Sequence, residues 1–207
     1  MSEILDIVDE NGQPTGQTVD REIAHEQGIR HRTAHVWIVR KNEGRIEVLL
    51  QKRASNKDSF PGRFDTSSAG HIRAGDEPRS SAIRELKEEL GITATADELK
   101  YTDKFVIQYE KEFYGKMFKD SEIAFVFIYT KTVSIEDMTL QEEELDGAEW
   151  FEINYVYEEC KKHNQKFCVP IKGLEIVKNA CKDETLFSTD SVQTNVDTQT
   201  EVVQADE

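Results

Sequence analysis

Apolar and alternating runs recur through the first 130 residues of the chain and predict the strands of a β-sheet. We expect strands at 4–8, 34–40, 45–53, 63–69, 101–108 and 122–130. The KNEG segment at 41–44 has the length of a hairpin loop and would join the second strand to the third. Phe60-Pro61-Gly62 interrupts the chain before the fourth strand.

A helix is predicted between Pro78 and Gly91, since acidic residues precede it and glycine suits its C-cap. Its apolar positions form one stripe, made of Ala82, Ile83, Leu86 and Leu90. Two further helices are expected at 152–163 and 171–182.

The end of the chain differs in composition from the rest. Residues 185–207 are rich in Ser, Thr, Gln and acidic residues, and no basic residue follows Lys182. We therefore expect one domain over 1–184 and an acidic, disordered tail over 185–207. A solvating terminus is the favoured interpretation of this tail, and partner binding is the alternative.

Charge and composition exclude several classes of protein. The formal net charge of −15 argues against a nucleic-acid surface, which needs clustered Lys and Arg. No apolar run approaches the roughly 20 residues that span a membrane, and the acidic start lacks a secretory signature. Three cysteines without a CxxC spacing fit reduced thiols. We expect a soluble, cytoplasmic protein, and its oligomeric state stays open.

Glu85, Glu88 and Glu89 carry the candidate chemistry of the predicted helix. Their i, i+3, i+4 spacing places three like charges on one face, which repel one another unless a cation lies among them. Carboxylate oxygens are the ligands that Mg²⁺ prefers, and Mg²⁺ commonly accompanies phosphate groups. The alternative for these three residues alone is a solvated charged face.

The spacing around these glutamates extends into a longer pattern. Gly70, Asp76 and Arg84 precede the glutamates in a run that closes with Gly91 and Ile92. This run of 23 residues resembles the signature box of Nudix hydrolases, and eight of its nine defined positions match. Aspartate at 76 is the one departure, because the family usually has glutamate there.

The resemblance implies a Nudix fold, an α/β/α sandwich around a mixed sheet, and hydrolysis of a diphosphate linkage. It implies that Mg²⁺ or Mn²⁺ is bound by Glu85, Glu88 and Glu89, while Arg84 pairs with a box carboxylate and holds the helix in place. A metal neutralises charge on phosphoryl oxygens and lowers the pKa of a bound water. A box glutamate or Glu122 would then accept the proton of that water.

A second resemblance covers most of residues 4–170 and concerns the Nudix branch close to type I isopentenyl-diphosphate isomerases. It is carried by runs such as REIAHEQGIRHR, LLQKRASNKDSFPG and FDTSSAGH. Those isomerases have a Cys-Gly-His run where this chain has Ala69-Gly70-His71. Proton transfer to and from an alkene needs an acid and a base on opposite faces. The missing thiol therefore favours a hydrolase over an isomerase.

The isomerase resemblance also implies a possible second metal site and a diphosphate-binding loop. The metal site would use five residues: His25, His31, His71, Asp120 and Glu122. The alternative is that His25 and His31 are hydrogen-bonded loop residues. Arg53 and Lys57 would contact the diphosphate, as cations suit a phosphate ligand. His35 is expected to be structural, and Trp37 and Trp150 to pack in or near the core.

Three functions compete on this basis. The first is a metal-dependent hydrolase acting on a small-molecule diphosphate, with nucleoside diphosphate derivatives as expected substrates. The second is an isomerase of isoprenoid diphosphates, which the alanine at 69 disfavours. The third is a non-catalytic nucleotide-binding module, which ranks last because all three box glutamates are present.

Overall fold

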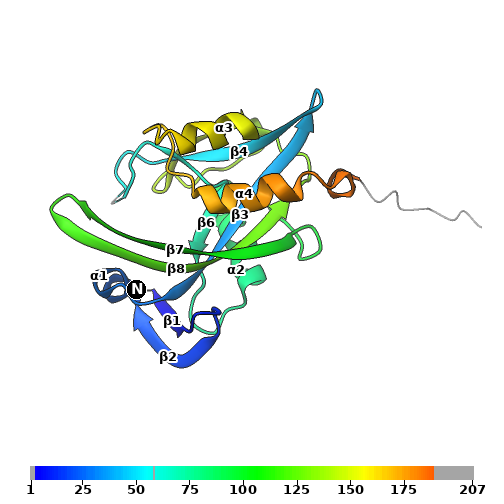
Figure 1. Ribbon diagram of the computed structural model, residues 1–207. Helices are drawn as coiled ribbons and strands as arrows, with labels where there is room; N and C mark the ends of the chain where they lie inside the picture. Colours follow the sequence, from blue (N-terminus) through cyan, green and yellow to red (C-terminus); the bar gives the residue numbers. More distant parts are fainter. Residues whose placement is uncertain (1–2, 58, 189–207) are drawn as a thin grey trace, which may run out of the picture.

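The computed structural model describes residues 3–57 and 59–188 and builds them around one large mixed sheet (Figure 1). The elements follow in this order: β1 (Ile4–Val8), β2 (Pro14–Asp20), α1 (Arg21–Gln27), β3 (His31–Asn42), β4 (Arg45–Arg53), β5 (Phe64–Asp65), β6 (Ser68–His71), α2 (Pro78–Leu90), β7 (Lys100–Phe113), β8 (Lys116–Tyr129), η1 (Ile135–Asp137), β9 (Leu145–Glu152), α3 (Ile153–Lys161), α4 (Ile171–Ala180) and η2 (Glu184–Phe187).

The long strand β3 is the axis of the seven-stranded sheet, whose order is β5-β4-β3-β8-β7. It runs parallel to β8 and antiparallel to β4 and β6, while β9 pairs with β4. Nine successive residues of β3, 31–39, are buried. Such a continuous buried run, without alternation of buried and exposed residues, is typical of a strand that is covered on both faces.

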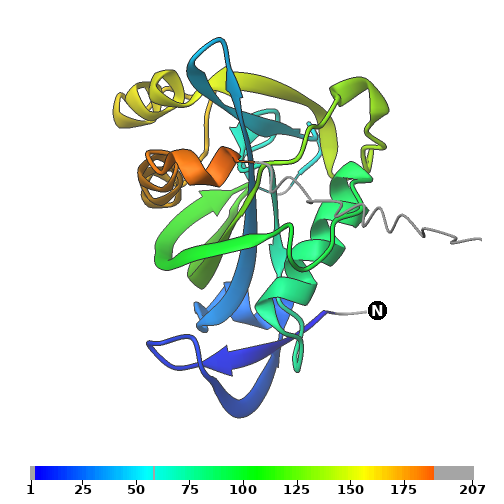
Figure 2. The ribbon, with the colours of Figure 1, turned by 90° about the vertical axis from the view of Figure 1, so that its right-hand side faces the viewer.

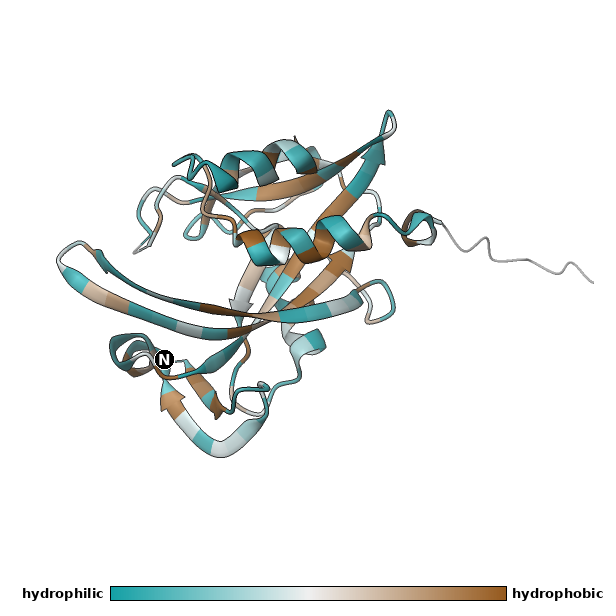
Figure 3. Cartoon of the chain, in the orientation of Figure 1, coloured by the Kyte–Doolittle hydropathy of each residue, from teal (hydrophilic) through white to brown (hydrophobic). Residues whose placement is uncertain are grey.

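Two apolar layers cover the sheet, one on each face (Figure 2). On one face Ala82 and Leu86 of α2 pack with Val36 of β3. On the other, Val156 of α3 and Leu174 of α4 pack with buried residues of β3, β4 and β8. The expected α/β/α sandwich around a mixed sheet is therefore confirmed. Figure 3 shows the hydrophobic colour along β3 and β4, with hydrophilic residues on the outer sides of the helices.

Strands β3 and β4 pair only near their shared hairpin, from Val39 opposite Val48 to Asn42 opposite Arg45. Before that point β3 pairs with β6 and β8, whereas β4 pairs with β5 and β9. The sheet therefore splits into two branches. The candidate site lies where the branches diverge.

Several strand boundaries differ from the sequence-based prediction. The predicted strands at 101–108 and 122–130 belong to one long hairpin of β7 and β8, which turns at Tyr114-Gly115. Both turn residues have positive φ, at 48° and 77°, as a two-residue hairpin turn requires. The predicted strand at 63–69 is two strands, because β5 pairs with β4 and β6 pairs with β3.

Besides the short 3-10 helices η1 and η2, three elements were not predicted. The exposed strand β2 and the short helix α1 are mostly polar, so neither shows a clear apolar period. Strand β9 occupies 145–152, and the helix predicted from 152 begins one residue later. Glu152 is its N-cap, since its carboxylate accepts from the amides of Asn154 and Tyr155 at 3.1 and 2.7 Å.

The expected tail falls largely outside the described residues, which end at 188. Within the expected range, Leu186 is buried among the residues that α3 and α4 cover. Trp37 is fully buried, as predicted, and Trp150 packs at the edge of the α2 layer. In the described part of the chain, no helix combines the length and apolar character needed to cross a membrane.

Candidate active site

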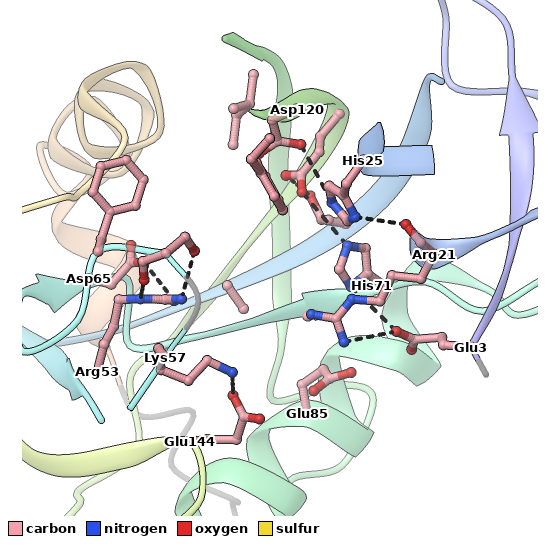
Figure 4. A pocket seen from close by; sticks show the side chains of 18 of the residues that line it. Glu3, Arg21, His25, Arg53, Lys57, Asp65, His71, Glu85, Asp120 and Glu144 are labelled. Carbon is pink, nitrogen blue, oxygen red and sulfur yellow. Dashed lines mark hydrogen bonds and ion pairs between the residues drawn. The ribbon is translucent and has the colours of Figure 1, made fainter. Parts of the chain in front are cut away.

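A cleft of about 2010 Å³ opens between the two branches of the sheet and contains most of the predicted site residues. Its walls come from α1, α2, the β7–β8 hairpin and the residues Arg53, Lys57, Ser59 and Phe60. Figure 4 shows two groups on opposite sides. His25 and His71 face Arg21 and Glu3 on one side, and Arg53 and Lys57 lie with Asp65 and Glu144 on the other.

Glu85 lies against the backbone of Gly70 at the inner side of α2. A Cβ built on Gly70 would come within 2.1 Å of the Glu85 Cδ atom, so any side chain at 70 would force the Glu85 carboxylate to move. Arg84 donates to the His71 carbonyl at 3.0 Å and pairs with Glu85 and Glu88 at 2.5 and 3.1 Å. Arg84 thus ties α2 to β6 and orients two glutamates.

Glu89 is the most enclosed of the three glutamates and is 6% exposed. Its Oε2 accepts from the amide of Ala69 at 3.2 Å. Burial, with a further contribution from the charge of Glu85, raises the pKa of Glu89 to about 8. Burial also raises the pKa of Glu85. A cation beside these carboxylates would offset both effects.

Glu88 and Asp76 are placed differently. Glu88 lies at the rim of the cleft with a half-exposed side chain. Asp76 contributes through its backbone: its amide donates to the Arg73 carbonyl at 3.0 Å and its carbonyl accepts from Arg32 at 3.1 Å. The departure from the family pattern therefore falls in the turn before α2.

A second group assembles around Glu122 from four separate elements. His25 of α1, His31 of β3, His71 of β6 and Glu122 of β8 each offer a ligand atom, and these atoms lie within 4.8 Å of one another. We call these four residues the histidine group and Glu85, Glu88 and Glu89 the helix glutamates. Asp120, the fifth predicted ligand, lies beside the group with Oδ1 3.9 Å from His25 Nε2.

Backbone carbonyls fix the orientation of two of these rings. His25 Nδ1 bonds to the Arg21 carbonyl at 2.9 Å, and His31 Nδ1 bonds to the Ile29 carbonyl at 2.8 Å. The Nε2 atoms therefore face the centre of the group. Among the described residues, the Nε2 atoms of His31 and His71 and Oδ1 of Asp120 are buried without a hydrogen-bond partner. Such orientation is typical of histidine metal ligands.

Burial keeps His25 and His71 in the neutral form. It lowers the pKa of His25 to about 4 and brings the pKa of His71 well below its usual range. Although burial opposes it, the interaction with His31 lowers the pKa of Glu122, whose Oε2 also accepts from Thr33 at 2.9 Å. Burial and the charge of Glu122 raise the pKa of Asp120. Glu122 is thus the carboxylate that keeps its charge.

The donor sets differ in chemistry. The helix glutamates offer oxygen alone, which suits Mg²⁺, and the mixed nitrogen and oxygen set suits Mn²⁺ or another transition metal. In the described part of the chain, only the histidine group gathers its ligand atoms this closely, since Arg84 lies between Glu85 and Glu88. Both donor sets fit a divalent ion.

Arg53 and Lys57 lie across the cleft from the histidine group, and both are already paired. Arg53 donates to the carbonyl and hydroxyl of Ser59 at 3.0 and 3.1 Å and to Asp65 at 3.4 Å. Lys57 pairs with Glu144. An anionic ligand would compete with these carboxylates for the two cations.

Among the charged residues that line the cleft, Glu3, Arg21 and Glu144 were not predicted from the sequence. Glu3 lies 3.5 Å from His71 Nδ1 and 3.6 Å from both Arg21 and Arg73. Arg21 could have been found, since it precedes His25 by one helical turn on α1. Glu144 lies in an acidic run without periodicity, so no sequence signal singled it out.

Comparison with known proteins places this geometry in a family. The model of the NUDIX domain matches residues 29–168. The chain belongs to the Nudix hydrolase family. An uncharacterised Nudix hydrolase of Clostridium acetobutylicum is 40% identical over 152 residues, which make up 73% of this chain and 71% of that protein. Nudix hydrolase 3 of Arabidopsis thaliana is 38% identical over 150 residues, 72% of this chain and 19% of that protein.

Two solved structures share the fold of this Nudix hydrolase. A Deinococcus radiodurans protein superimposes with a TM-score of 0.59 at 16% identity, covering 77% of this chain and 90% of its own. The NUDIX domain of Shewanella oneidensis NrtR, solved with ADP ribose, gives 0.51 at 12% identity and covers 73% and 86%. At these identities the likeness concerns the fold alone.

Proposed function

We propose that this Nudix hydrolase uses Mg²⁺ or Mn²⁺ to cleave a diphosphate linkage in small molecules, namely nucleoside diphosphate derivatives. One observation carries the proposal: carboxylates and histidines line one side of a cleft, and the cationic side chains of Arg53 and Lys57 line the other side. A diphosphate is a polyanion that divalent ions and cationic side chains bind together. The NrtR domain, which binds ADP ribose, shares the fold.

The proposed roles follow from the contacts. Glu85, Glu88 and Glu89 hold the metal, which when bound supplies charge neutralisation at the phosphoryl oxygens and an acidified water. Arg84 positions the glutamates through its pairs with Glu85 and Glu88. Gly70 leaves the space into which the Glu85 carboxylate folds.

The general base is proposed to be Glu89 rather than Glu122. A base works best when its pKa lies near the working pH. Without a metal the pKa of Glu89 is raised to about 8, and a bound cation would bring it down toward the working pH, whereas the interaction with His31 already holds the pKa of Glu122 below its usual range. Glu122 is better suited to ligation within the histidine group, where the Thr33 hydroxyl fixes its second oxygen.

Arg53 and Lys57 are proposed to bind the diphosphate. Lys57 would exchange its ion pair with Glu144 for a phosphate oxygen. Arg53 would keep its bonds to Ser59 and exchange its bond with Asp65 for a phosphate oxygen. Guanidinium and ammonium groups both form strong charge-assisted bonds with phosphate.

The test is hydrolysis of a panel of nucleoside diphosphate derivatives, including ADP-ribose and diadenosine polyphosphates, by the purified protein with Mg²⁺ or Mn²⁺. Glu85→Gln and the wild-type protein in EDTA are the controls. We expect turnover that both controls abolish. Equal turnover by Glu85→Gln would refute the metal-site assignment. Tight binding without turnover in the wild type would favour a non-catalytic module.

The histidine group favours one second candidate, an isomerase of isoprenoid diphosphates, because that branch implies a metal at these residues. Ala69 offers a methyl group where such an isomerase needs a thiol. Cys168 also lines the cleft, but its Sγ bonds to the Phe64 carbonyl at 3.4 Å and burial raises its pKa. Double-bond migration in isopentenyl diphosphate, followed by NMR, would support this candidate; its absence would exclude it.

A further inference from the structure

His35 of β3 and Gln51 of β4 lie at the floor of the cleft and have no role in the proposed chemistry. They are 5% and 2% exposed, and both side chains line the cleft. Among the described residues, His35 Nδ1 and Gln51 Oε1 are buried without a hydrogen-bond partner. Buried polar atoms are almost always paired in folded proteins. These two atoms therefore point to a partner outside the chain.

The split in the sheet explains why the floor is polar. His35 stands on β3 beyond the stretch that pairs with β4, and Gln51 is opposite Asp65 in the β4–β5 pair. The charges of Glu122 and Asp65 both act on the His35 ring. The floor thus connects the histidine group with the Arg53–Asp65 pair. Its carboxylates disfavour a second anionic group there.

The wall beside this floor is aromatic. The ring of Phe60 lies 6.0 Å from that of Tyr109 and 5.0 Å from that of Phe113, and all three residues line the cleft. Tyr109 stacks on Phe118 at 6.2 Å. Aromatic walls bind the flat faces of rings through offset or edge contacts. A neutral ring with polar edge atoms would satisfy both surfaces.

The size of the cleft agrees with this occupant. Its volume of about 2010 Å³ exceeds the roughly 300–1,000 Å³ of a typical ligand pocket, so a diphosphate and its metals leave room for a bulky group. A side-chain amide suits the donor and acceptor atoms on a nucleobase edge. An apolar chain would leave both floor atoms unpaired.

We propose that His35 and Gln51 bind the hydrogen-bonding edge of a nucleobase whose ring lies against the Phe60–Tyr109–Phe113 wall. The inference rests on the proposed function and narrows it, since these two residues would select the nucleoside part of the substrate. It replaces the expectation that His35 is structural.

The test compares the binding of AMP and ribose 5-phosphate, which differ only in the base, by calorimetry. Gln51→Leu and His35→Phe remove the polar atoms and keep most of the side-chain volume. We expect each variant to lose at least about tenfold in affinity for AMP, as one lost hydrogen bond implies, with no change for ribose 5-phosphate. Gln17→Leu, on the exposed strand β2, makes the same substitution outside the cleft and should leave both affinities unchanged.

Thermal unfolding separates binding from a structural role. An unpaired buried acceptor does not stabilise the fold, so Gln51→Leu should melt no lower than the wild type. A lower melting temperature would overturn the proposal, as would wild-type affinities that are equal for AMP and ribose 5-phosphate. If the wild type and both variants bind AMP equally, water alone forms hydrogen bonds with His35 Nδ1 and Gln51 Oε1. That result would also overturn the proposal.

The binding test does not depend on catalysis, because AMP has no diphosphate linkage. Base-dependent binding without hydrolysis of ADP-ribose would sink the proposed function and support this inference. With hydrolysis present, kcat/KM for ADP-ribose should fall about tenfold in Gln51→Leu, while activity on isopentenyl diphosphate should not fall. Equal losses on both would overturn the nucleobase assignment.

Discussion

The helix glutamates and the histidine group line the same cleft but are assembled in opposite ways. The helix glutamates come from two turns of α2, and their geometry follows from helical periodicity and from Arg84. The histidine group gathers single residues from α1, β3, β6 and β8, and the parallel pairing of His31 with Glu122 fixes its centre. One site is local in sequence, and the other exists only in the folded sheet.

Their electrostatics differ in the same way. Burial raises the pKa of Glu89 to about 8, so this carboxylate holds a proton near neutral pH that a metal must displace. Burial lowers the pKa of His25 and His71, so these two histidines are already in their ligating form. The first site is thus sensitive to pH near neutrality and the second is not. The following experiments test this contrast.

The largest effect is expected for Glu89→Gln, which removes the proposed base and a metal ligand together. We expect kcat with Mg²⁺ to fall by about 10²–10⁴, as loss of general base catalysis implies. Steady-state hydrolysis of the best panel substrate measures it. A loss below about threefold would show that Glu89 has neither role and that the helix site is not the catalytic one.

Stability provides the control for that variant. Because folding raises the pKa of Glu89, its contribution to stability is complete below its unfolded value, about 4.3, and is lost as the pH rises through about 8. Glutamine stays neutral. The metal-free variant should therefore melt no lower than the wild type at pH 8, and a lower melting temperature would mean that misfolding explains the lost activity.

His31→Asn tests the other half of the comparison. His31 is fully buried and directs Nε2 at Glu122 across 3.7 Å, so its loss should weaken Mn²⁺ binding by about 10²-fold, at the upper end for a perturbed metal site. Calorimetric titration with Mn²⁺ in Glu85→Gln and His31→Asn backgrounds would assign each binding event. His163→Asn, an exposed control, should leave both events unchanged. Loss of the same event in both backgrounds would mean one shared site.

The contrast also explains what the sequence could predict. The core positions of α2 and its start at Pro78 follow from apolar period and capping, and both agree with the structure. The histidine group was reached only through a family resemblance, because no local pattern relates His25 to His71. His35 and Gln51 were missed as binding residues, since their unpaired atoms depend on where β3 and β4 part. Side chains that meet through sheet topology leave no periodic signal.

The pH dependence of metal binding should separate the two sites. Glu89 must lose a proton to ligate, so Mg²⁺ affinity at the helix site should rise about tenfold per unit from pH 6 to 8. His25, with a pKa of about 4, is neutral across that range, so Mn²⁺ affinity at the histidine group should stay nearly flat. Calorimetry at pH 6, 7 and 8 measures both. If the Mg²⁺ and Mn²⁺ affinities change equally with pH, the opposite pKa shifts of Glu89 and His25 do not govern metal binding.

The smallest effect is expected for Gly70→Ala, which tests how closely β6 and α2 are fitted. The added methyl group would lie 2.1 Å from Glu85 Cδ, so the carboxylate must move away from β6. Overpacking of this kind costs about 1–3 kcal/mol, which lowers the melting temperature by several degrees. Gly147→Ala is the matched control, because its added Cβ meets nothing within 4 Å.

Activity distinguishes displacement of Glu85 from a general loss of stability. At a temperature where both variants are folded, Gly70→Ala should lose Mg²⁺-supported hydrolysis by about tenfold through the displaced ligand, while Mn²⁺ binding at the histidine group stays within twofold. Strand β6 carries both Gly70 and His71, so a distortion of the whole strand would weaken both sites. If Mg²⁺-supported hydrolysis and Mn²⁺ binding fall together, β6 supports both sites rigidly. The helix glutamates would then depend on the folded sheet as much as the histidine group does.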